Sequence, residues 1–160
     1  MKRLVLLAIL ILGLIGTQIQ ATDIIKPRVL VSTDIGGTDP DDNQSMAHLL
    51  MYTDCLDLEG IVSSPSYGSG NREEILRMID LYEKDLPKLS EHIKGLMSPA
   101  ELRAITKQGR KGAAPYRGFL TPTEGSRWIV QCARRQDERP LWISCLLYTS
   151  PSPRDRTRSR

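Results

Sequence analysis

The chain has 160 residues, a formal net charge of +3 and three cysteines. This length is enough for one domain with a buried core. The positive charge lies at the two ends, since residues 2–3 carry +2 and residues 154–160 carry +3, which leaves −2 on residues 22–143. The central part therefore lacks the basic excess of a nucleic-acid-binding protein, and we expect no nucleic-acid partner.

The cysteines give no indication of a disulfide framework. Cys55 and Cys132 are too few and too far apart along the chain for one, and Cys145 lies close to the arginine-rich end. We expect Cys55 and Cys132 to be small residues of the core.

The first 21 residues have the order of a secretory signal peptide. Lys2 and Arg3 precede an apolar run at 4–15, and small and polar residues follow as far as Ala21. The apolar run is shorter than the roughly 20 residues that cross a bilayer. We therefore expect cleavage after Ala21, export to the periplasm or the medium, and no stable membrane anchor after cleavage.

Residues 144–160 differ in character from the rest of the chain. A strand-like run that starts at Leu141 passes into serine, proline and arginine. This ending resembles translated read-through of a sequencing adapter, so we interpret residues 144–160 as a non-native or disordered tail. The alternative is a disordered basic tail that binds an acidic surface.

Between the two ends, predicted strands alternate with predicted helices. In chain order the predicted elements are strand 28–33, helix 43–52, strand 58–63, a helix capped by Asn71 and Glu74, a helix opened by Ser98 that runs to Lys107, helix 123–134, and a strand that starts at Leu141. This alternation predicts an α/β fold in which helices flank a mainly parallel sheet. Ligands of such sheets bind beyond the carboxyl ends of the strands.

Four carboxylates lie within nine residues after the first predicted strand: Asp34, Asp39, Asp41 and Asp42. Such crowding is unfavourable unless a cation or hydrogen bonds compensate it. Oxygen ligands without a nearby histidine or cysteine favour calcium over zinc. The alternative is that these aspartates only cap the next helix in solvent.

The run Val31–Gly36, followed by Asp41 and Asp42, resembles the acidic signature of the inosine-uridine nucleoside hydrolase superfamily. Within it, the chain is most similar to secreted cellulose-binding, nucleoside-hydrolase-like proteins. That similarity continues through residues 58–64, 123–126 and 139–142, and so covers about residues 26–143. The resemblance implies a Rossmann-like α/β domain, of which residues 22–143 would be the N-terminal part.

The resemblance also implies a chemistry, the hydrolysis of an N-glycosidic bond with a calcium-bound water. Asp34 would be a calcium ligand and the general base, and Asp42 a second calcium ligand. Asp41 and Asn71 would bind sugar hydroxyls of a nucleoside or another glycoside. Ser32 stands where the signature has its first acid, and residues 37–40 lengthen the loop. The superfamily's remaining site residues come from segments that we do not find here, so we expect an incomplete domain.

Two other functions fit parts of the sequence. A non-catalytic module that binds cellulose or another polysaccharide would use aromatic side chains, of which Tyr67 and Tyr116 lie on predicted loops and Trp128 on an apolar helix stripe. The run Asp34–Thr38 also resembles the phosphate-binding turn of sugar kinases, although a helix rather than a hairpin is predicted to follow it. Neither the substrate nor the oligomeric state follows from the sequence.

Overall fold

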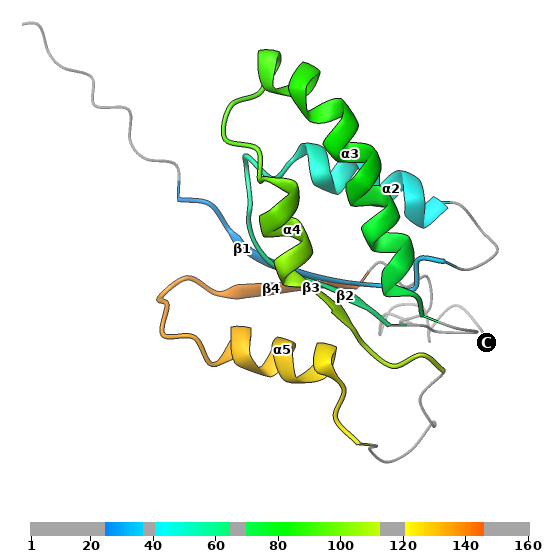
Figure 1. Ribbon diagram of the computed structural model, residues 1–160. Helices are drawn as coiled ribbons and strands as arrows, with labels where there is room; N and C mark the ends of the chain where they lie inside the picture. The colour runs from blue at the N-terminus through cyan, green and yellow to red at the C-terminus, as the bar shows by residue number, and fades with distance from the viewer. Residues whose placement is uncertain (1–24, 37–40, 65–69, 113–120, 146–160) are drawn as a thin grey trace, which may run out of the picture.

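The computed structural model describes residues 25–36, 41–64, 70–112 and 121–145. Its elements are β1 (Arg28–Thr33), α2 (Asp41–Met51), β2 (Asp57–Ser63), α3 (Arg72–His92), α4 (Pro99–Ile105), β3 (Thr106–Gln108), α5 (Glu124–Ala133) and β4 (Leu141–Cys145) (Figure 1). The predicted α/β class with a parallel sheet flanked by helices is confirmed. The predicted signal peptide lies outside the described residues, as do residues 146–160 of the predicted tail. Ser144 and Cys145, predicted to belong to that tail, are instead the last residues of β4 and pair with β1.

The sheet has four parallel strands in the order β3-β2-β1-β4. The chain moves outward from β1 to β2 and β3, and then crosses to the other side of β1 to form β4. Helices α2, α3 and α4 lie on one face of the sheet and α5 lies on the other (Figure 1). The strand order therefore reverses between β1 and β4, and in open α/β sheets such a reversal is where ligands bind.

Each face of the sheet has its own apolar core. Successive residues of a strand point to opposite faces, so Val31 and Ile61 pack under α2, α3 and α4, whereas Leu30 and Val62 pack against α5. The strands are thus apolar on both faces, as parallel strands between two helix layers are. The larger core cluster comprises Val31, Ile35, Met46, Leu50, Leu58, Ile61, Ile75, Met78, Ile79, Tyr82 and Leu102.

A bulge in β2 brings α5 close to the sheet. Val29 pairs with Leu58 and Leu30 with Gly60, so Glu59 is an extra residue. Its carbonyl accepts a hydrogen bond from Trp128 Nε1 at 2.9 Å. A Cβ added at Gly60 would lie 2.9 Å from that same nitrogen, so this close packing requires glycine. Trp128 is half-buried here, in agreement with its predicted place on an apolar helix stripe.

Three helices begin with side-chain caps, as their sequences predict. Ser98 forms a capping box with Glu101 at the start of α4, and Thr123 forms one with Ser126 at the start of α5. Asn71 caps α3 by accepting a hydrogen bond from the backbone N–H of Glu73. Glu74, the predicted capping-box partner, binds Arg77 and Asn43 instead.

The structure corrects three further predictions. The helix predicted to reach Lys107 ends at Ile105, and Thr106–Gln108 form the edge strand β3, which was not predicted. Helix α2 starts two residues earlier than predicted, at Asp41. Cys132 is buried as predicted, but Cys55 is exposed because it lies in the turn that follows α2.

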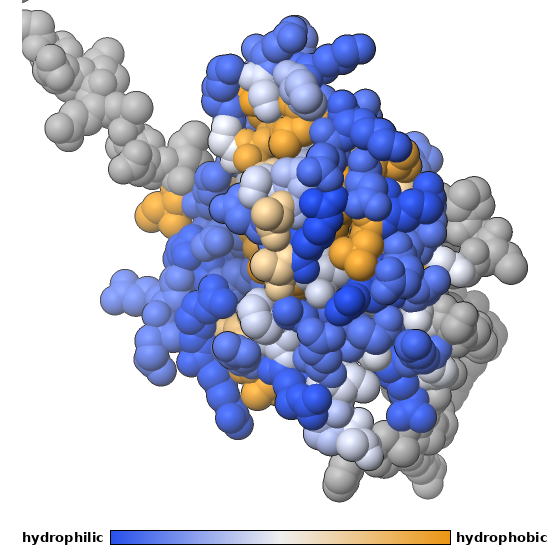
Figure 2. All heavy atoms as spheres, in the orientation of Figure 1, coloured by the Kyte–Doolittle hydropathy of each residue, from blue (hydrophilic) through white to orange (hydrophobic). Residues whose placement is uncertain are grey.

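The surface in the view of Figure 2 is mainly hydrophilic, with apolar side chains gathered over α3 and α4. Leu81 of α3 is 41% exposed. Within the described ranges, no helix has the length and apolar character needed to cross a bilayer.

Candidate functional site

The acidic loop starts at the carboxyl end of β1, where the strand order reverses. Thr33, the last residue of β1, is fully buried. Its hydroxyl accepts a hydrogen bond from the N–H of Ile35 at 3.1 Å and donates one to Asp42 Oδ2 at 3.2 Å. Thr33 therefore joins the turn after β1 to the start of α2. Asp34 is part of that turn, between Thr33 and Ile35 in the chain.

Asp34 and Asp42 come together as a carboxyl pair. The pKa of Asp42 is raised to about 6, first by burial and then by a hydrogen bond with Asp34 and the negative charges of Asp34 and Asp41, against the lowering effect of the Thr33 hydroxyl. Asp41 is exposed, and its Oδ1 accepts a hydrogen bond from the N–H of Asp42 at 2.9 Å. The two carboxyls repel each other where they meet, and a cation bound there would relieve that repulsion.

Asn71 lies beside the acidic loop, although it is far away in sequence. Gly36 has a φ of 101°, and a Cβ added there would lie 3.1 Å from the Cβ of Asn71. The Oδ1 atom of Asn71 is used in capping α3, at 3.0 Å from the N–H of Glu73. Its Nδ2 group is thus the part of the side chain that could donate to a ligand.

A contact between α2 and α3 fixes the spacing of these residues. Asn43 Nδ2 donates to Glu74 Oε1 at 2.7 Å, and Arg77 binds the same carboxylate. The guanidinium of Arg77 lowers the pKa of Glu74, with Asn43 acting in the same direction. The first turn of α2, just after Asp42, is therefore bonded directly to the first turn of α3, which Asn71 caps.

The donor set fits part of a calcium shell. Calcium takes roughly 6 to 8 oxygen ligands, and the described residues bring two carboxylates together, those of Asp34 and Asp42. Among these described residues, no three acidic, histidine or cysteine side chains form a group that could hold a metal ion. The fourth aspartate of the loop, Asp39, lies outside the described residues. The metal and sugar roles of Asp34, Asp41, Asp42 and Asn71 stay predictions.

Two residues at this edge were missed by the sequence reasoning. Ser63 and Gln108 are the last residues of β2 and β3, and both lie in register with Thr33 across the sheet. The Ser63 hydroxyl is buried and has no hydrogen-bond partner in the part of the chain that the structure describes. The available signal was their position at strand ends, but β3 was not recognised as a strand.

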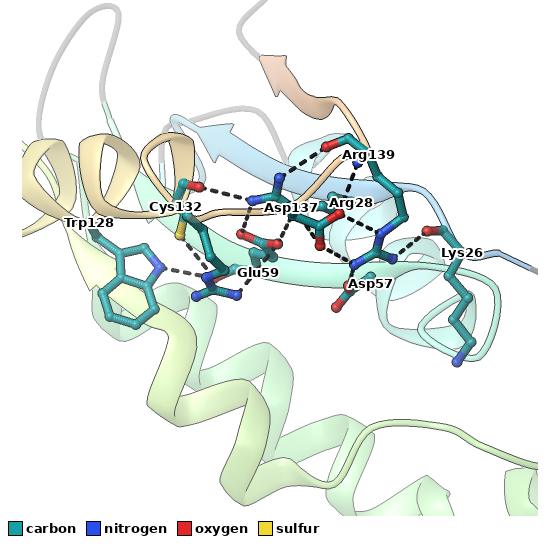
Figure 3. Close-up of polar contacts among 9 residues, drawn as sticks. Lys26, Arg28, Asp57, Glu59, Trp128, Cys132, Asp137 and Arg139 are labelled. Atoms are coloured by element: carbon teal, nitrogen blue, oxygen red, sulfur yellow. Dashed lines mark hydrogen bonds and ion pairs between the residues drawn. The ribbon is translucent and has the colours of Figure 1, made fainter.

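A separate network of charges lies at the amino ends of the strands, opposite the acidic loop (Figure 3). Arg28 Nε donates to Glu59 Oε1 at 2.5 Å, and both residues are nearly inaccessible to solvent. The other Arg28 nitrogens donate to the carbonyls of Cys132 and Arg139 at 2.9 and 3.0 Å. Asp137 and Asp57 bind Arg139, whose hydrogen bonds lower the pKa of Asp137. These charges compensate one another, and the network connects β1, β2, α5 and the approach to β4.

The parallel sheet, its reversal beside β1 and the acidic loop at that point define an α/β domain with its candidate site at the carboxyl edge of the strands. The chain belongs to the family described as "Cellulose-binding Sde182, nucleoside hydrolase-like domain", whose model matches residues 28–147. The predicted family is thus confirmed. The match extends past the predicted domain boundary at residue 143, and the origin of the tail stays a prediction.

A solved structure is similar to the same region. It is described as a nucleoside hydrolase-related hypothetical protein from Saccharophagus degradans that is associated with carbohydrate metabolism. The two chains are 32% identical, with a TM-score of 0.67, over 74% of this chain and 29% of that chain. This chain therefore spans less than a third of that protein's length. No curated protein matches this chain.

Proposed function

We propose that this domain contributes the calcium-binding and sugar-binding residues of an N-glycosidic hydrolase site, which acts on nucleosides or related glycosides. The observation that carries the proposal is the meeting of Asp34 and Asp42 at the carboxyl end of β1, with the Asp42 pKa raised to about 6. The family described as nucleoside hydrolase-like supports it. The remaining residues of such a site would come from elsewhere in a longer domain.

Asp34 and Asp42 would hold the cation. When bound, calcium would lower the pKa of a coordinated water and hold neighbouring sugar hydroxyls. Asp34 would accept the proton of the attacking water, and Asp41 would accept a hydrogen bond from a sugar hydroxyl. Asn71 Nδ2 would donate to another hydroxyl. Carboxylates at these positions would stabilise the positive charge that builds up on the sugar ring as the bond breaks.

The first test is calcium binding, measured by calorimetry and by thermal unfolding of the 160-residue chain. A cation that binds only the folded state stabilises it by about 2.7 kcal/mol when its free concentration is about 100 times its Kd. We expect this stabilisation in the wild-type protein and its loss in Asp34→Asn and Asp42→Asn. The control Asp85→Asn removes an exposed carboxylate on α3 and should keep it. Equal calcium affinity in all four proteins would exclude a metal site at this pair.

The second test is hydrolysis of inosine and of uridine, followed by release of free base in the presence of calcium. We expect Asp34→Asn to lower the rate by about 100-fold or more, because general-base catalysis contributes on that scale. Because the remaining site residues would come from elsewhere in a longer domain, the assay uses a protein that includes them; calcium binding without hydrolysis in that protein would favour a binding role.

A carbohydrate-binding module without catalysis is the second candidate. The cellulose-binding description of the family and the association of the similar structure with carbohydrate metabolism favour it. Trp128 does not serve as a free stacking surface, since Nε1 is bonded to Glu59 and Lys107 lies 4.6 Å from the ring centre. Tyr67 and Tyr116 lie outside the described residues. Trp142, 63% exposed on β4, is the accessible indole, and cellulose pull-down of Trp142→Ala against wild type tests this candidate.

A further inference from the structure

The last residues of three neighbouring strands form a polar row at the candidate site. Thr33 is in register with Ser63, and Ser63 is in register with Gln108. In a parallel sheet such partners point to the same face, which here is the face covered by α2, α3 and α4. The row therefore lies beneath the starts of the two helices that carry Asp42 and Asn71.

The two outer members of the row each hold one half of the candidate site. Thr33 binds Asp42, as described above. Gln108 binds the residues on either side of Asn71, because its Oε1 accepts from the N–H of Arg72 at 3.0 Å and its Nε2 donates to the carbonyl of Gly70 at 3.3 Å. The turn that presents Asn71 is thus bonded to the end of β3 by one side chain.

A second backbone contact supports the same arrangement. The N–H of Gly70 donates to the carbonyl of Lys111, just after β3, at 2.9 Å. On its other side, Asn71 packs against Gly36 of the acidic loop. Two sets of contacts therefore position Asn71. The end of β3 and Lys111 bind the residues next to it, and Gly36 of the acidic loop packs against its side chain.

We propose that Gln108 is a positioning residue, which holds the turn at residues 70–72 so that Asn71 stays beside the acidic loop. The inference rests on the proposed function in so far as Asn71 binds a sugar. A glutamine suits this task because one amide group supplies both the acceptor for Arg72 and the donor for Gly70. Glutamate would keep the acceptor but lose the donor, and methionine would lose both at similar size.

The test compares Gln108→Glu and Gln108→Met with the wild-type chain. Gln131→Met, an exposed residue on α5, is the matched control, and Asn71→Ala is the reference for loss of the positioned group. Two readouts are needed: hydrogen exchange of the Arg72 amide by NMR, and binding of D-ribose in the presence of calcium. Calcium affinity is measured in parallel, because the Gln108 side chain binds the turn around Asn71, whereas the calcium proposal rests on Asp34 and Asp42.

We expect Gln108→Met to remove the exchange protection of the Arg72 amide and to weaken ribose binding about tenfold, as changes in supporting residues commonly do. Calcium affinity should stay the same, and Gln108→Met should add little to the loss caused by Asn71→Ala. Gln108→Glu should keep the Arg72 protection but shift the Gly70 resonances.

Each remaining outcome separates this inference from the proposed function. Unchanged Arg72 protection in Gln108→Met overturns the positioning role, whatever ribose does. Lost protection with unchanged ribose affinity also overturns it, since the position of Asn71 would then not matter. If wild-type protein binds no ribose, the proposed function fails, and the exchange readout alone decides whether Gln108 holds the turn.

Discussion

Thr33 and Ser63 occupy equivalent positions on adjacent strands, yet their hydroxyl groups differ in what they bind. The Thr33 hydroxyl has two hydrogen bonds, to Ile35 and to Asp42. The Ser63 hydroxyl is buried without a partner in the described part of the chain. A buried polar group without a partner loses its hydration on folding and regains nothing.

We therefore expect Ser63→Ala to leave the free energy of unfolding unchanged or to raise it by up to about 1 kcal/mol. Thr33→Val should instead lower it by about 1.5 kcal/mol, since it removes a hydrogen bond to a carboxylate. Urea unfolding of both variants measures the difference. A clear destabilisation by Ser63→Ala would mean that this hydroxyl is bonded in solution.

At the scale of single elements, the starts of α3, α4 and α5 were predictable from the sequence, whereas α2 starts two residues earlier than predicted. Their caps use contacts within four residues, so the sequence contains the whole interaction. In the capping box of α4, the Ser98 hydroxyl lies 2.7 Å from Glu101 Oε2 and 3.3 Å from the N–H of Glu101.

Ser98→Ala should lower the free energy of unfolding by about 1 kcal/mol, the usual effect of losing an N-cap. The control is Ser45→Ala at an exposed position inside α2, which should be neutral or slightly stabilising because alanine favours helices. Chemical denaturation of the two variants gives the comparison. Equal effects would show that the Ser98 cap contributes no stability.

Strand β3 shows where local patterns fail. Thr106, Lys107 and Gln108 have no apolar alternation, and they follow a good helix pattern directly. They form a strand because they pair with Ile61, Val62 and Ser63 of β2. That pairing depends on residues about 45 positions earlier, which explains why a window of the sequence did not reveal it.

At the scale of the whole molecule, the network around Arg28 joins the starts of β1 and β2 to the end of α5 and the approach to β4 (Figure 3). Its central carboxylate is Glu59, which is 4% exposed. Removing one partner of a buried ion pair leaves an uncompensated charge in the interior.

Glu59→Gln should therefore lower the free energy of unfolding by about 3 kcal/mol. Glu83→Gln removes an exposed partner of Arg103 on the surface and should have no measurable effect, because solvent screens such pairs. Differential scanning calorimetry distinguishes the two. A similar small effect for both would mean that the network around Arg28 is open to water.

The sequence by itself determined the alternation of strands and helices, the caps and the family. These properties depend on residue periodicity and on contacts a few residues apart, and the acidic signature is contiguous enough to recognise. Asp34, Asp41 and Asp42 could be chosen because they lie close together on the chain.

Only the tertiary structure decided the strand order, the pairing of Asp34 with Asp42, and the alignment of Ser63 and Gln108 with Thr33 at the strand ends. The physical reason is that each depends on which strand lies beside which. Strand β4 lies next to β1, and β3 lies next to β2. Because the strands are parallel, this order brings their carboxyl ends side by side. Gln108 reaches the turn around Asn71 through that arrangement alone, so no local feature of its sequence marks it as part of the site.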